Sequence, residues 1–177
     1  MGRIYTPGTM PLKFWLIAMF CAVLPDISAI FTRFGVSNEA LLGHRNFTHS
    51  LSFALITGFV AVWLGFREVK LFSRSSISLW IFFFICTASH GLLDAMTNGG
   101  LGIAFYSPFS GERYFLPWTP VDMPEIKPNQ FLGKWGKKVI ISELIWICLP
   151  MLVLMLSVVG FRKWRSRQNP ILRVGVE

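Results

Sequence analysis

Five side chains that commonly bind metal ions fall in three short stretches, each beside an apolar run. The stretches are Pro25-Asp26, His44 to His49 and His90 to Asp94, and they contain all three histidines of the chain. His90 and Asp94 are four residues apart, a spacing that puts two ligands on one face of a helix. An ionisable side chain in a membrane span costs about 2.5–3.5 kcal/mol to insert, so a function is expected there. A hydrogen-bonded pair that only stabilises the helices is the alternative.

His44 and His49 are five residues apart and would lie on different faces of a straight helix. They converge if the chain before Asn46 is a loop and a helix begins at Thr48, whose hydroxyl would cap it. Two surface histidines are the alternative. Asp26 follows Pro25 and is predicted to be a metal ligand or to orient a histidine ligand. The alternative is that Asp26 only ends a helix and has no role in a site. We therefore predict one metal site with five ligands: Asp26, His44, His49, His90 and Asp94.

Imidazole and carboxylate ligands without thiolates suit Zn²⁺, with Mn²⁺ or Fe²⁺ as alternatives. Three or four such ligands with one open position describe a catalytic zinc that acidifies water. Arg45 and Arg113 are predicted catalytic residues, because a guanidinium binds a phosphate or a developing oxyanion. Glu143 is predicted to lie level with the site, as a general base or as a partner of Lys137 or Lys138.

The composition indicates that membrane helices must position these residues. Of the 177 residues, 53% are hydrophobic and only 15% are charged, and the mean hydropathy is +0.54. The net charge of +8 does not indicate nucleic acid, because the basic residues flank the apolar runs. Cys21, Cys86 and Cys148 lie inside apolar runs without C-x-x-C spacing, which argues against disulfides and a cysteine zinc site.

We predict an all-α, multi-pass transmembrane bundle of about four spans, forming a single domain over residues 1–177. The long aromatic and proline-rich loop at 97–138 is expected to fold over one membrane face or lie in the interface. A cleaved signal peptide is the alternative for the first apolar run, although no A-x-A site follows it. The predicted spans are about 11–31, 48–66, 77–96 and 139–160.

Basic residues predict the orientation. Three lie in the short segment Arg67 to Arg74 and five lie after Gly160, which places both termini in the cytoplasm. Every candidate ligand and the long loop then fall on the outer face.

At these residues the sequence resembles the membrane-bound, metal-dependent hydrolases typified by LexA-regulated, YdjM-like inner-membrane proteins of bacteria. The resemblance extends from about Trp15 to Arg113. It implies a multi-pass protein of the bacterial inner membrane whose hydrolase site uses the five ligands above. Family members often carry an earlier histidine on an extra helix, whereas no histidine precedes His44 here. The matching stretches are Leu24 to Ile27, His44 to Ser50 and Ser89 to Thr97, with Gly99 to Phe109 similar to the family's following loop.

We therefore predict a metal-dependent hydrolase that acts on an ester or phosphoester, with a phospholipid or another membrane lipid as the candidate substrate. A non-catalytic, metal-stabilised membrane protein of a stress response is one alternative. A small transporter is the other, and it is less favoured because the polar residues crowd one end of the spans.

Overall fold

The computed structural model describes residues 10–123 and 134–168. They belong to two compact units, Met1–Thr119 and Pro120–Glu177. Within the described residues the regular elements are helices, and the β pairing is one isolated bridge between Ile103 and Tyr114. Three helical segments are long and apolar enough to cross a membrane, and a fourth apolar helix is shorter. The prediction of an all-α, multi-pass bundle is confirmed, whereas the single domain stays a prediction.

The first span is interrupted in the middle. Helix α1 (Leu12–Val23) leads into the 3₁₀ turn η1 (Leu24–Asp26), and α2 (Ile27–Arg33) continues in the same direction. The helix is interrupted at Pro25 because proline has no backbone N–H to donate to the carbonyl one turn earlier. The candidate span Leu12–Arg33 agrees with the predicted 11–31. Asp26 thus lies at a break inside the span instead of at its end.

The second apolar helix starts later than predicted. The 3₁₀ turn η2 (Phe47–His49) precedes α3 (Leu51–Gly65). The prediction that Thr48 caps this helix is wrong, because the Ser50 hydroxyl accepts the Phe53 N–H at 3.1 Å. The 15 residues of α3 extend about 22 Å at 1.5 Å per residue, less than the ~30 Å of bilayer hydrocarbon.

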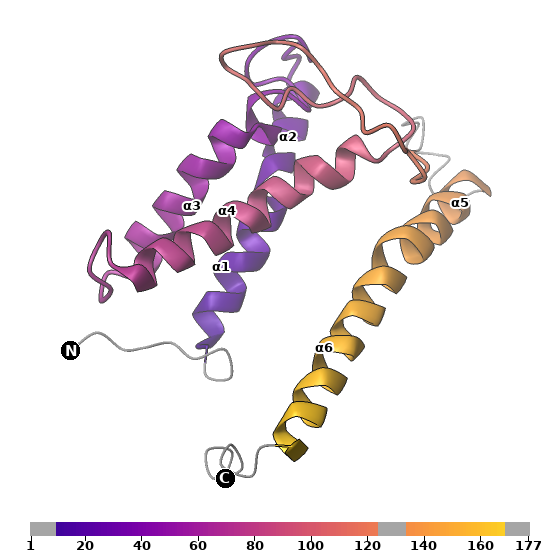
Figure 1. Cartoon of the computed structure of the whole chain (residues 1–177). Coiled ribbons are helices and arrows are strands. Elements are labelled where there is room, and N and C mark those ends of the chain that lie inside the picture. The colour runs from indigo at the N-terminus through magenta and orange to yellow at the C-terminus, as the bar shows by residue number, and fades with distance from the viewer. Residues whose placement is uncertain (1–9, 124–133, 169–177) are drawn as a thin grey trace. The chain divides into compact units, whose positions relative to one another are not determined.

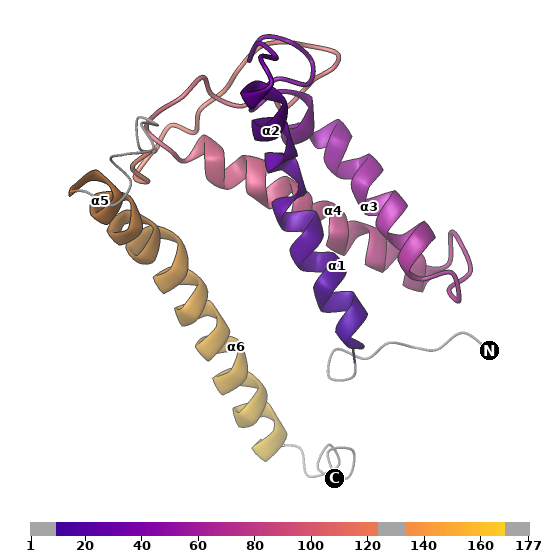
Figure 2. The ribbon, with the colours of Figure 1, turned by 180° about the vertical axis from the view of Figure 1, so that it is seen from behind.

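Helix α4 (Arg74–Ala95) begins three residues before the predicted start and packs against both α1 and α3 (Figures 1 and 2). Gly58 allows α3 to approach α4 closely, since an added Cβ would lie 2.9 Å from the Phe84 nitrogen. The core of this unit is apolar and aromatic. Its buried members are Phe14, Ala18, Cys21, Val62, Phe66, Val69, Leu79 and Phe83.

The chain after α4 crosses over the end of the bundle near α2 (Figures 1 and 2). Three backbone hydrogen bonds fix it there: Leu51 N–H to Phe105 O at 3.0 Å, Ala104 N–H to Arg45 O at 3.2 Å and Leu116 N–H to Ala95 O at 2.9 Å. The first half of the predicted loop at 97–138 is therefore attached to the end of the helical bundle and covers it, and we refer to it as the covering loop. The next helix begins at Lys134, four residues before the predicted end of the loop.

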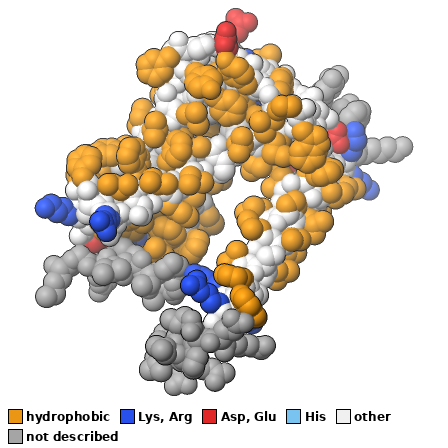
Figure 3. Space-filling model, viewed as in Figure 1, with side chains coloured by type: hydrophobic (Ala, Val, Ile, Leu, Met, Phe, Trp, Pro, Cys, Tyr) orange, Lys and Arg blue, Asp and Glu red, His pale blue; other side chains and the backbone are white. Residues whose placement is uncertain are grey.

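The surface of the bundle is apolar along the helices and basic at one end. Figure 3 shows hydrophobic side chains over α3 and α4, and basic side chains near the turn that joins them. Arg67, Lys70 and Arg74 are exposed in that segment. This distribution is typical of helices whose sides face lipid.

The second unit contains one long helical segment. Helix α5 (Lys134–Glu143) passes through a π-helical turn (Leu144–Cys148) into α6 (Leu149–Gln168). Pro150 lies two residues after the end of this π-helical turn, and its missing N–H explains why the regular pattern of helical hydrogen bonds is interrupted. The candidate span Gly136–Arg165 includes the predicted 139–160. The three cysteines are free, as predicted.

Candidate metal centre

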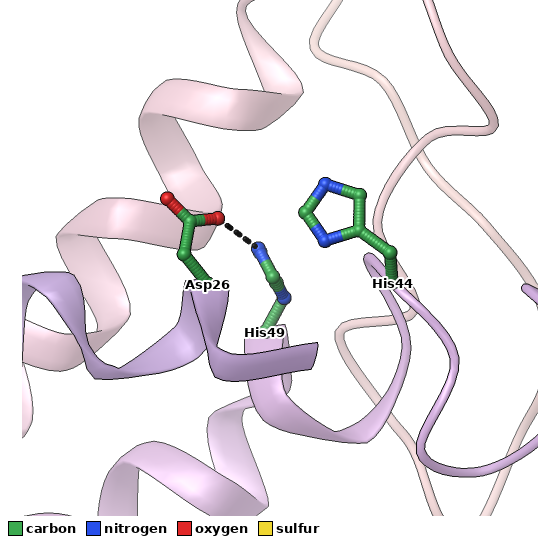
Figure 4. A group of neighbouring side chains, drawn as sticks. All are labelled: Asp26, His44 and His49. Atoms are coloured by element: carbon green, nitrogen blue, oxygen red, sulfur yellow. Dashed lines mark ion pairs between the residues drawn. The ribbon is translucent and has the colours of Figure 1, made fainter. Parts of the chain in front are cut away.

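The five predicted ligands come together where η1, η2 and the last turns of α4 meet. They form two overlapping groups, Asp26 with His44 and His49, and His49 with His90 and Asp94. Within each group the ligand atoms lie within 4.8 Å of one another. Figure 4 shows the first group, with the Asp26 carboxylate directed at the His49 ring and the His44 ring on the other side of it.

Two imidazole nitrogens and two carboxylate oxygens surround one small space. His49 Nε2 lies 3.3 Å from Asp94 Oδ2 and 3.7 Å from Asp26 Oδ1. His90 Nε2 lies 3.3 Å from Asp26 Oδ1 and 3.9 Å from Asp94 Oδ2. In a tetrahedral zinc site with bonds of 2.0–2.2 Å, the ligand atoms are about 3.3–3.6 Å apart. The two distances of 3.3 Å fit this spacing, and those of 3.7 and 3.9 Å are slightly longer.

The His49 ring gives an independent reason for a cation. Its side chain is fully buried, and its Nε2 atom makes no hydrogen bond although two carboxylates are near. An unpaired buried polar atom costs about 1–3 kcal/mol. A metal ion between this nitrogen and the two carboxylates would satisfy all three groups. The donor set therefore fits a divalent metal.

His44 contributes from the loop before η2. Its Nδ1 lies 3.3 Å from Ser28 Oγ, and its ring centroid is 5.1 Å from that of His49. Burial lowers the pKa of His44 below its usual value, and the neighbouring His49 lowers it further. The neutral imidazole is thus favoured, which is the form that binds metals.

Arg45 is buried behind the predicted ligand Asp94. Its backbone is left-handed at φ 62°, and its side chain is only 4% exposed. The guanidinium donates to Gly99 O at 2.8 Å and to Thr97 Oγ1 at 3.1 Å, and its Nε lies 3.5 Å from Asp94 Oδ2. Arg45 thus ties the covering loop to a ligand, and its predicted binding of a substrate anion stays a prediction.

Arg113 and Glu143 are not members of the two candidate ligand groups. Arg113 donates to three backbone carbonyls, those of Asn38 at 2.6 Å and of Arg45 and Gly102 at 3.3 Å each. It therefore holds the loop before η2 against the covering loop. Glu143 is exposed at the end of α5 in the second unit. The catalytic roles of both residues stay predictions.

Sequence reasoning missed two residues at the site, Ser28 and Gly91, and gave a third, Thr48, the different role of a helix cap. Ser28 and Thr48 hydrogen-bond to each other and to the rings of His44 and His49. Gly91 lets α4 touch η2, because an added Cβ would lie 2.7 Å from His49 O. Their positions in the sequence could have indicated them, since each lies within two residues of a predicted ligand.

Comparison with known proteins identifies the family. A family model described as YdjM inner membrane protein matches residues 3–165. The chain belongs to this family. A curated relative, named Inner membrane protein YbcI of Escherichia coli (strain K12), is 36% identical over 158 residues, which cover 89% of this chain and 87% of YbcI. No solved structure matches the chain significantly. The predicted resemblance to YdjM-like inner-membrane proteins is confirmed, and the YdjM-family protein is a multi-pass helical protein of an inner-membrane family.

Proposed function

We propose that this YdjM-family protein is a metal-dependent hydrolase that cleaves an ester or phosphoester at the membrane surface. The observation that supports this most is the buried, unpaired Nε2 of His49, which faces two carboxylates at 3.3 and 3.7 Å. A divalent metal, Zn²⁺ with Mn²⁺ or Fe²⁺ as alternatives, supplies Lewis acidity and activates water at such a site.

The side chains around this site have separate roles in the proposed reaction. His49 and His90 present Nε2 atoms, and Asp26 and Asp94 supply negative charge that balances a divalent cation. Arg45 holds Asp94 from behind. The Asp26 side chain is 49% exposed whereas that of His49 is fully buried, so a substrate would enter from the Asp26 side.

A membrane lipid fits the surroundings of the site. An apolar groove of about 390 Å³ runs between α1 and α3. One end of the groove is lined by Leu24, two residues before Asp26, and by Phe53, four residues after His49. The other end is lined by Ile17 and Gly65. An acyl chain in this groove would put its headgroup beside the ligands. A phospholipid is therefore the candidate substrate.

The proposed topology puts the site on the outer face and both termini in the cytoplasm. The ligands lie beside the start of α3 and in the last turns of α4, opposite the basic segment that joins these helices. Short basic loops remain on the cytoplasmic side.

The test is hydrolysis by purified protein in vesicles of phosphatidylethanolamine and phosphatidylglycerol, with lipids and products measured by mass spectrometry. Wild-type protein loaded with Zn²⁺ or Mn²⁺ is expected to release a product, and His49→Ala is expected to release none. Ser78→Ala, an exposed change near the opposite end of α4, serves as the control. Full metal occupancy without cleavage of any ester or phosphoester would favour the non-catalytic, metal-stabilised alternative.

A further inference from the structure

Ser28 is a buried junction between two ligand-bearing segments. Its side chain is fully buried, and its Oγ has three polar neighbours: Pro25 O at 3.0 Å, Thr48 Oγ1 at 3.0 Å and His44 Nδ1 at 3.3 Å. Their chemistry decides where each proton lies.

The direction of each hydrogen bond follows from the carbonyl. The Pro25 oxygen can only accept, so the single hydroxyl proton of Ser28 is donated to it. Thr48 must then donate its proton to Ser28, since Ser28 has none left for that bond. For the same reason His44 must donate from Nδ1 to Ser28. One carbonyl thus orients both hydroxyl groups and one imidazole.

The same reasoning extends to His49. Its Nδ1 lies 3.0 Å from Thr48 Oγ1, whose proton is already donated to Ser28. His49 must therefore donate from Nδ1 as well. In a neutral imidazole with a proton on Nδ1, the lone pair is on Nε2. The Nε2 atom of His49 is the one that faces Asp26 and Asp94.

We propose that Ser28 and Thr48 are positioning residues that fix His44 and His49 as Nδ1–H tautomers, so that both offer Nε2 as the ligand atom. The ligand role rests on the proposed metal site, whereas the tautomers follow from the hydrogen bonds alone. His90 reaches the same state independently, because its Nδ1 lies 2.8 Å from the Ala22 carbonyl, which can only accept. His90 is therefore an internal reference.

The direct test is ¹⁵N NMR of the histidine rings in metal-free, full-length protein at a pH where the rings are neutral. The chain has three histidines, and each signal set is assigned from the variant that lacks that residue. Wild-type protein is expected to show three Nδ1–H tautomers. In Ser28→Ala the His44 and His49 signals are expected to gain the Nε2–H form, whereas in Thr48→Val only His49 changes. His90 stays unchanged in both variants.

The second readout is Zn²⁺ affinity by competition with a chelator. Loss of a group that orients a ligand typically lowers metal affinity 10–100-fold, so we expect about that for Ser28→Ala and Thr48→Val. Ser76→Ala is the matched control, because Ser76 is also buried and donates to a backbone carbonyl, that of Ser73, in the first turn of α4.

The outcomes separate the two proposals. An Nε2–H tautomer at His44 or His49 in wild type, or unchanged tautomers in Ser28→Ala, would overturn the inference even if metal binds. Wild-type protein that binds no metal would overturn the hydrolase proposal, while the NMR pattern would still decide the roles of Ser28 and Thr48.

Discussion

Replacing Gly91 by alanine tests the geometry of the site without removing any polar group. Gly91 lies on α4 between His90 and Asp94, and an added Cβ would be 2.7 Å from the His49 carbonyl oxygen. Ordinary van der Waals contact begins at 3.4 Å, so α4 and η2 must separate by 3.4 − 2.7 = 0.7 Å. Metal–ligand distances tolerate only about 0.2 Å, so this displacement is large for the site.

The expected cost has two opposing parts. Overpacking against a backbone oxygen costs about 1–3 kcal/mol, whereas alanine gains about 0.5–1 kcal/mol over glycine in a helix. The net loss is therefore between about 0 and 2.5 kcal/mol, which lowers the midpoint of thermal unfolding by up to several degrees for a chain of this size. We expect metal affinity to fall at least about tenfold, because the displaced residue, His49, is a predicted ligand.

The assay is thermal unfolding of detergent-purified protein together with Zn²⁺ affinity by chelator competition. Gly160→Ala in α6 is the matched control, since nothing lies within 4 Å of its added Cβ and only the helix preference changes. If Gly91→Ala bound metal like wild type and gained stability like the control, the close contact between α4 and η2 would be refuted.

Three further changes follow from the same structure. Arg45→Ala is expected to lower the free energy of unfolding by about 3 kcal/mol, because it removes the buried partner of Asp94. Thermal unfolding of this variant is compared with that of Arg67→Ala, a change at an exposed arginine, and equal effects of the two changes would contradict the prediction. Ser50→Ala removes the cap of α3 and is expected to cost about 1 kcal/mol, seen as faster amide hydrogen exchange in the first turn; unchanged exchange would argue against the cap. Ala61→Phe fills the apolar groove and is expected to slow phospholipid cleavage with metal content unchanged, whereas full activity would exclude the groove as an acyl site.

Local geometry explains which parts of the site could be predicted from the sequence. His90 and Asp94 lie on one continuous helix, so their spacing alone sets them on one face, and their ring and carboxylate lie 3.9 Å apart. Asp26 was predicted because its expected level in the membrane matches that of the other candidates. It follows Pro25, which ends the apolar run at the place where η1 forms. The apolar runs also predicted the spans, although α3 begins at Leu51 instead of Thr48 and α4 begins at Arg74 instead of Ile77.

The remainder depends on contacts between distant segments, which residue spacing does not encode. Ser28 and Thr48 are 20 residues apart and meet only because η1 and η2 pack together. Thr48 cannot cap α3, since its hydroxyl bonds to Ser28 and His49 instead. Arg45 bonds to Thr97 and to Gly99, more than 50 residues away along the chain. Its burial was therefore not predictable from the loop sequence.

The most direct test of the central claim is elemental analysis of detergent-purified wild-type protein beside His49→Ala and His90→Ala. The metal site predicts about one zinc, manganese or iron per chain in wild type and none in either variant, with each variant still folded by circular dichroism. Wild-type protein that contains no metal after growth in metal-supplemented medium, or variants that retain it, would contradict the account.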